Sequence, residues 1–166
     1  MYRTIEDFKN DWTYESAATF KIIQGLTDES LNKKFNDKVR TPGRLAWHIA
    51  GAIPEMMNRT ELNIDVIVDN KVVPQTVSEI ESAYKKSAGL LIEEVTQKWT
   101  DSSLTEKVNM YGEDWEKGKI LSVLVTHQIH HRAQLVVLMR MAGLKVHGIY
   151  GPANEEWAEM GMDPEE

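Results

Sequence analysis

Cysteine is absent from the 166 residues of this sequence. Its absence excludes disulfides, thiolate metal ligands and a thiol nucleophile supplied by the protein itself. Any metal ion must therefore bind through His, Asp or Glu side chains, and any thiol chemistry must use a thiol from outside the chain. The lack of Cys is also compatible with the cytoplasmic location that we expect for this protein.

Long apolar runs are missing as well. The longest uninterrupted apolar stretches span only a few residues, whereas a membrane-spanning helix needs about 20. The first residues, MYRTIEDFKNDW, carry acidic side chains where a signal peptide requires an apolar segment. We therefore expect neither a membrane partner nor export.

Basic residues are fewer than acidic ones, since 19 Lys and Arg stand against 26 Asp and Glu, giving a net charge of -7 with His neutral. Because nucleic-acid binding depends on neutralising phosphates, we expect no nucleic-acid partner. The hydrophobic share of 42% and the charged share of 27% are typical of a globular chain. This length supports one domain with a sizeable core, so we predict a single domain over residues 1–166.

Apolar residues recur at helical spacing in four stretches, which predicts four amphipathic helices. The first runs from Thr4 to Leu26, the second begins at Pro42, the third runs from Thr76 to Trp99, and the fourth runs from Lys117 to Ala142. A short helix is also expected within residues 152–160, with Trp157 as its apolar anchor. Because strand signals are weak, the predicted fold class is all-α: a four-helix bundle with long connections and a short C-terminal helix.

Pro54 interrupts the pattern of the second helix, because proline has no backbone N–H to donate. We expect a kink or an early end of this helix near Gly51. Residues 58–75 and 101–115 are predicted to be long connections without a sheet. Within the first of them, Asp69-Asn70 can form a turn between two extended pieces that are too short to support a sheet.

The fourth helix carries His127 and His131 within the segment THQIHHR. At this spacing both imidazoles project from one helix face, about 6 Å apart along the axis, so one metal ion can bind both. His48 lies on an apolar face of the second helix, which can face the fourth in a bundle. Three inward imidazoles leave coordination positions open, as catalytic metal sites do. Spacing alone also allows buried imidazoles bonded to carboxylates or water.

Other chemistries have little support in the sequence. A glycine-rich phosphate loop and the GxSxG and HExxH motifs are absent, and no carboxylate pair stands out from the polar helix faces. His130 and His147 lie off the inward face and are not expected to be ligands. Arg132 lies about 100° round the helix from His131. It either pairs with a carboxylate of another helix or of the C-terminal segment, or binds an anionic cosubstrate.

Three segments resemble the DinB-like superfamily, which includes YfiT-like metal-dependent hydrolases and bacterial thiol S-transferases: TPGRLAWHIAG, LSVLVTHQIHHRAQLVVLMRMAG and GIYGPANEEW. The resemblance covers essentially the whole chain, with Ala133 where many members have glycine. It implies a four-helix bundle in which His48, His127 and His131 bind one divalent ion per chain, nickel or zinc. It also implies a homodimer, for which Met56, Met57 and Trp157 are expected to supply apolar surface.

Three functions are compatible with such an ion. The expected function is transfer of a low-molecular-weight thiol to an electrophile, because a Lewis-acid metal ionises a bound thiol and this chain has no sulfur nucleophile of its own. The alternatives are a metal-dependent hydrolase, in which the ion holds hydroxide, and a metal-containing stress protein that binds a small molecule without turnover. The fold does not choose among them.

Overall fold

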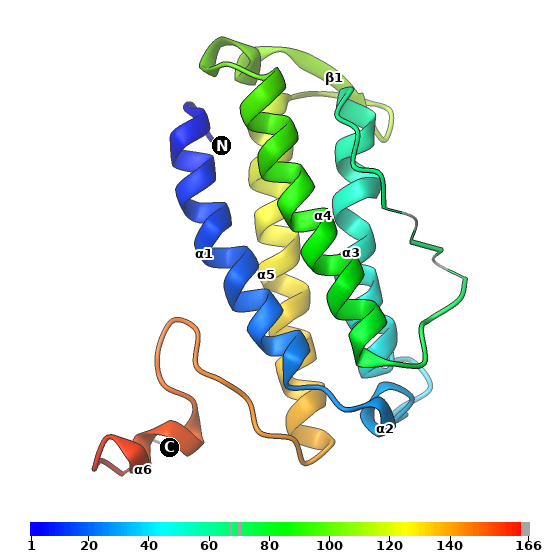
Figure 1. Ribbon diagram of the computed structural model, residues 1–166, viewed down its shortest axis with the longest axis vertical. Helices are drawn as coiled ribbons and strands as arrows, with labels where there is room; N and C mark the ends of the chain where they lie inside the picture. The colour runs from blue at the N-terminus through cyan, green and yellow to red at the C-terminus, as the bar shows by residue number, and fades with distance from the viewer. Residues whose placement is uncertain (67, 70, 164–166) are drawn as a thin grey trace.

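The computed structural model of the chain describes residues 1–66, 68–69 and 71–163. Its elements, in chain order, are α1 (Ile5–Gln24), α2 (Asp28–Leu31), α3 (Pro42–Met57), the 3₁₀ turn η1 (Asn58–Thr60), α4 (Val77–Lys98), the 3₁₀ turn η2 (Asp101–Thr105), β1 (Lys107–Met110), β2 (Glu113–Glu116), α5 (Lys117–Met141) and α6 (Asn154–Glu159). Figure 1 shows α1, α3, α4 and α5 side by side along the long axis. The expected all-α four-helix bundle is therefore confirmed.

Threonine side chains set the starts of three of these helices. The hydroxyls of Thr4, Thr41 and Thr76 each accept a hydrogen bond from the backbone N–H three residues later. Each such cap stabilises a helix by about 1 kcal/mol. After α5, Gly143 adopts a φ of +78°, a left-handed conformation that favours glycine and ends the helix.

The bundle core lies where α1 and α3 each pack against both α4 and α5. Phe8, Ile53, Leu91 and Leu135, one from each long helix, are fully buried there. Burying a side chain of this size stabilises a fold by about 1.5–3 kcal/mol. Because of this packing, the second and fourth of the predicted helices lie against each other, and His48 can approach α5. In the described part of the chain, no helix is both long and apolar enough to cross a membrane.

The expected early end of α3 near Gly51 is wrong, because the helix continues through Pro54 to Met57. Pro54 removes one backbone hydrogen bond. The last turn nevertheless buries Ile53, Met56 and Met57, with at most 4% of each side chain exposed. Burial of three large apolar side chains outweighs one missing hydrogen bond.

The connection at residues 101–115 contains a β-hairpin that the sequence analysis missed. Strands β1 and β2 pair antiparallel, with Met110 opposite Glu113. The turn residues Tyr111 and Gly112 have φ of 56° and 91°, as a two-residue hairpin turn requires. Tyrosine is a poor residue for positive φ, so the turn signal was weak; burial of Met110 at 0% exposure ties the hairpin to the core.

The C-terminal segment projects from the end of the bundle (Figure 1). The short helix is present as α6, but Trp157 is only partly buried and α6 contributes no buried residue. Ile149 packs against the core instead, and Tyr150 donates a 2.7 Å hydrogen bond to Glu15 of α1. The expectation that Trp157 anchors this segment is therefore wrong, because Ile149 and Tyr150 make the contacts with the bundle.

The long connection between α3 and α4 begins with the η1 turn and is otherwise irregular in its described residues, as expected. The turn proposed at Asp69-Asn70 includes a residue outside the described part of the chain. Trp47 of α3 donates a 2.9 Å hydrogen bond from its indole N–H to the carbonyl oxygen of Asp69, which ties this connection to the bundle.

Candidate metal centre

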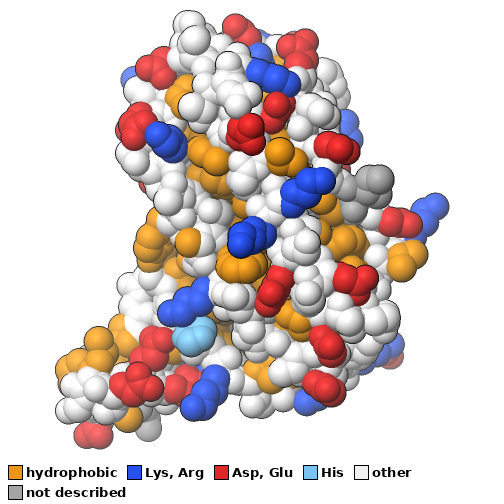
Figure 2. All heavy atoms as spheres, viewed as in Figure 1, with side chains coloured by type: hydrophobic (Ala, Val, Ile, Leu, Met, Phe, Trp, Pro, Cys, Tyr) orange, Lys and Arg blue, Asp and Glu red, His pale blue; other side chains and the backbone are white. Residues whose placement is uncertain are grey.

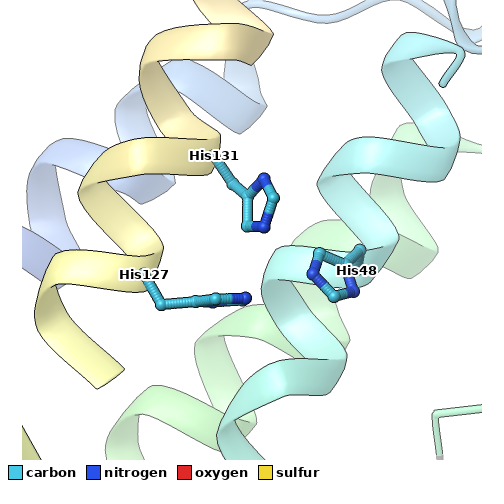
Figure 3. Close-up of side chains that lie close together, drawn as sticks. All are labelled: His48, His127 and His131. Carbon is cyan, nitrogen blue, oxygen red and sulfur yellow. The ribbon is translucent and has the colours of Figure 1, made fainter. Parts of the chain in front are cut away.

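Three imidazoles meet between α3 and α5. His48 comes from α3, and His127 and His131 come from successive turns of α5. One ring nitrogen from each lies within 4.8 Å of the other two, and Figure 3 shows the rings turned towards a common gap. Imidazole nitrogens bind zinc at about 2.0–2.1 Å, so small side-chain rotations bring all three to one ion. We call these three residues the imidazole cluster.

The hydrogen bonds of the imidazole cluster argue against the alternative of carboxylate-bonded histidines. Among the described residues, no Asp or Glu forms a hydrogen bond or ion pair with His48, His127 or His131. The Nδ1 atom of His127 is buried and has no hydrogen-bond partner within the described structure. An unpartnered buried polar atom costs about 1–3 kcal/mol and is typical of a site completed by a bound group.

Gln134 sets the orientation of His131. Its Oε1 lies 2.8 Å from Nδ1 of His131. Because an amide oxygen only accepts hydrogen bonds, Nδ1 carries the proton and Nε2 keeps its lone pair for a metal ion. The Nε2 of Gln134 lies 3.1 Å from Nε2 of the exposed His130 and donates to it. Gln134 was missed by the sequence analysis, although its position one helical turn after His131 was a usable signal.

Burial keeps the imidazole cluster uncharged near neutral pH. Burial first, and then the positive charge of Arg40 and the neighbouring histidines, lowers the pKa of His48 to about 4. Burial also lowers the pKa values of His127 and His131, and the charge of Arg40 acts on both in the same direction. Neutral imidazole is the form that binds metal. Three neutral nitrogen donors with no bonded carboxylate fit a divalent ion such as zinc or nickel.

A cavity of about 460 Å³ opens on one side of the imidazole cluster and is lined by His48, His127, Glu55 and Tyr111, among others. We call it the Glu55 cavity. The Tyr111 hydroxyl donates a 2.7 Å hydrogen bond to Oε2 of Glu55, and Arg59 donates to Oε1. Burial and the Glu55 hydrogen bond raise the pKa of Tyr111 to about 12. Glu55 was missed by the sequence analysis, although two helical turns separate it from His48.

A second cavity, of about 540 Å³, opens on the other side and is lined by His131, Gln134, Lys38 and Arg40 together with apolar residues. We call it the Lys38 cavity. Its basic residues come from the connection between α2 and α3, where the sequence shows no helical pattern, so they were not identified as site residues. The imidazole cluster therefore contributes to two cavities, one lined by a carboxylate that is paired with Arg59 and one lined by two cations.

Arg132 lies elsewhere in the bundle. Its guanidinium group is buried, with Nη2 2.7 Å from Oε2 of Glu15 and Nη1 3.1 Å from the hydroxyl of Thr19. Nη2 also donates to the hydroxyl of Tyr150 at 2.7 Å. This is the carboxylate pairing that the sequence left open, and Arg132 lines neither cavity beside the imidazole cluster.

The other two histidines also lie where they were expected. His130 is exposed and bonds Gln134, outside the gap between the three rings. His147 lies in the C-terminal segment, with Nδ1 3.5 Å from Glu156.

Fold and site together define a four-helix-bundle protein with a three-imidazole site able to bind a metal ion. The chain belongs to the DinB family, whose sequence profile matches residues 1–166. It is 39% identical over 163 residues to the uncharacterised protein YrdA of Bacillus subtilis (strain 168), covering 98% of each chain.

Two solved structures share this fold. A DinB-like protein from Bacillus cereus is 40% identical and superposes with a TM-score of 0.87, covering 90% of this chain and 100% of that chain. The DinB-like protein YjoA of Bacillus subtilis, at 14% identity and a TM-score of 0.67, covers 89% and 99%. At that low identity the second likeness shows the fold alone.

Proposed function

We propose that this protein is a metal-dependent enzyme that transfers a low-molecular-weight thiol to an electrophile, with a nickel or zinc ion bound by His48, His127 and His131. The observation that carries the proposal is the position of three neutral imidazoles between two cavities. A reaction between two substrates needs room for both beside one ion. When bound, the ion supplies Lewis-acid chemistry that favours a thiolate over its thiol.

The residues of this chain have defined tasks in such a reaction. The imidazole cluster contributes no negative charge, so it would leave the full charge of a bound ion available to polarise a thiol. Gln134 keeps Nε2 of His131 turned to the gap. The thiol proton leaves to solvent, a sulfur–carbon bond forms, and the leaving group departs from the electrophile with its bonding electrons.

Glu55 favours hydrolysis as a second candidate function. Its carboxylate lines the same cavity as His48 and His127, where it can accept a proton from an attacking water. Both of its oxygens, however, already accept hydrogen bonds, one from Arg59 and one from Tyr111. A base engaged in this way is weaker, so we place thiol transfer first.

The homodimer implied by the family resemblance is also part of the proposal, but its surface differs from the one expected. Met56 and Met57 are buried and supply no surface. The exposed large apolar side chains of the C-terminal segment are Tyr150, Met160 and Met162, and Figure 2 shows hydrophobic side chains gathered on this projecting segment at the lower left. Exposed apolar clusters of this kind favour association. Sedimentation should give twice the 19.0 kDa chain mass; a monomer at micromolar concentration would contradict it.

The test of the activity uses untagged protein loaded with Ni²⁺ or Zn²⁺, a panel of low-molecular-weight thiols and a chlorinated arene. We expect conjugate formation that depends on both metal and thiol and is lost in His48→Ala. His147→Ala is the matched control, because this exposed imidazole lies away from the imidazole cluster. Ester or amide cleavage without any thiol, lost in Glu55→Gln, would establish the hydrolase instead. If folded, metal-loaded protein shows no turnover, the remaining alternative is a protein that binds a small molecule without converting it.

A further inference from the structure

The Lys38 cavity carries local positive charge in an acidic protein. Residues 33–44 contain five basic side chains and one acidic side chain, although the net charge of the whole chain is -7. Within the described residues, no Asp or Glu lines this cavity, whereas Glu55 lines the cavity on the other side of the imidazole cluster. The carboxylate of Glu55 is paired with Arg59, so uncompensated charge lies on the side of the Lys38 cavity, which therefore favours an anionic ligand.

The basic residues of this segment differ in whether they have partners. The Nζ atom of Lys33 donates to the carbonyl oxygen of Ala142 at 3.0 Å, and Lys34 pairs with Asp37 at 2.7 Å. The side chains of Lys38 and Arg40 form no hydrogen bond or ion pair with any described residue. Within the described structure, the two cations of this segment that have no partner, Lys38 and Arg40, are thus the two that line the cavity.

The remaining wall of the Lys38 cavity is apolar. Val39, Val137 and Met141 line it, and between 45% and 58% of each of these side chains is exposed. Apolar side chains that line a cavity contact the apolar part of a bound molecule. This wall therefore fits a ligand that has an apolar portion. The cavity reaches the imidazole cluster at His131.

We propose that the Lys38 cavity binds the thiol substrate through an anionic group, with Lys38 and Arg40 contacting a carboxylate or phosphate while the sulfur reaches the metal site beside His131. This inference rests on the proposed function and specifies its substrate class, an anionic thiol. The electrophile then occupies the Glu55 cavity on the opposite side.

The test measures thiol binding to Ni²⁺-loaded or Co²⁺-loaded full-length protein by the thiolate-to-metal charge-transfer absorption. Two matched pairs of probes separate the sources of negative charge. Mercaptosuccinate is compared with its dimethyl ester, and 4′-phosphopantetheine is compared with pantetheine. We expect at least one anionic thiol to bind on the order of tenfold more tightly than its neutral partner, since two partly exposed cations act on it.

The charge of the cavity is then removed in a Lys38→Gln, Arg40→Gln double variant. This variant should lose the preference for the anionic thiol, bind the neutral thiol as before, and retain the metal. A Lys33→Gln, Lys34→Gln double variant is the matched control, because it removes two positive charges from the same segment outside the cavity. If this control lost the preference for the anionic thiol to the same extent, the effect would come from the overall positive charge of the segment, and the proposed site would be wrong.

The outcomes separate this inference from the proposed function. Charge-transfer absorption with equal affinity for anionic and neutral thiols overturns the anion site and leaves thiol binding at the metal intact. No absorption with any of the four probes, in protein that carries metal, overturns the proposed function together with this inference. A preference confined to one pair identifies the anionic group as carboxylate or as phosphate.

Discussion

His131 and Arg132 are neighbours on α5, but the fold satisfies their hydrogen-bonding and charged groups to different degrees. His131 belongs to the imidazole cluster, whose rings face one another across a gap and include a buried nitrogen without a partner. Arg132, the next residue, has its charge paired with Glu15 inside the bundle. Arg132 is satisfied within the fold, and removing one partner of its buried pair would be costly. The imidazole cluster has an unsatisfied nitrogen and is suited to bind a group from outside.

The largest expected effect is loss of the metal. Changing His127 and His131 together to Ala removes two of three ligands, so the metal content should fall from about one ion per chain to near zero. Elemental analysis of untagged protein measures it. His147→Ala should retain the metal. Full occupancy in the double variant would show that the imidazole cluster is not the metal site.

Arg132→Gln tests the buried ion pair between Arg132 and Glu15. It leaves Glu15 buried without its cation, and breaking a buried ion pair in this way lowers the free energy of unfolding by about 3–5 kcal/mol. Urea denaturation measures this loss, and metal content per folded chain should not change. Arg140→Gln breaks the exposed pair with Glu155 and should lower stability by no more than about 1 kcal/mol. Equal losses in the two variants would contradict the structural role of Arg132.

A smaller effect is expected at Gln134, which orients His131. Replacing it by Ala frees the imidazole to rotate, and loss of such a supporting hydrogen bond typically weakens metal binding by about 10–100-fold. Competition with a chelator of known affinity measures the change. Gln97→Ala is the control, because the side chain of this glutamine bonds Glu93 on the same exposed face of α4, away from the imidazole cluster. Unchanged affinity in Gln134→Ala would remove Gln134 from the site.

A further effect is expected from pH on the metal-free protein. Burial lowers the pKa of His48 to about 4 in the folded chain, whereas an imidazole in the unfolded chain has a pKa of about 6.5. The unfolded state therefore binds more protons between these values, and stability must fall as the pH decreases through this window. In His48→Gln, the loss of stability from about pH 6.5 to 4, followed by urea denaturation, should be shallower. An identical slope would show that His48 titrates normally.

Much of the helical architecture was accessible from local sequence. The threonine caps at Thr4 and Thr76 and the glycine after α5 act within a few residues of the helix ends they define. Apolar spacing does the same for the buried faces, and the His127 to His131 spacing places two imidazoles on one face wherever α5 packs. The positions of Glu55 and Gln134 relative to these histidines follow from the same helical period, so both were within reach of sequence analysis.

Features that depend on distant contacts were predicted poorly. Pro54 did not end α3, because the residues around it are buried by other helices. The hairpin at Tyr111 forms against a weak turn signal, with Met110 buried in the core. In both places burial supplied by the rest of the chain outweighed the local preference of the backbone.

Helix periods and capping residues act over a few positions, which is why the sequence alone specified a helical bundle and the two imidazoles of α5. The joining of His48 to them, the opening of cavities on both sides, and the pairing of Arg132 with Glu15 across 117 residues required the packed bundle. The physical reason is that a side chain's partners depend on which helices lie against it, and that arrangement depends on burying the apolar faces of the whole chain together.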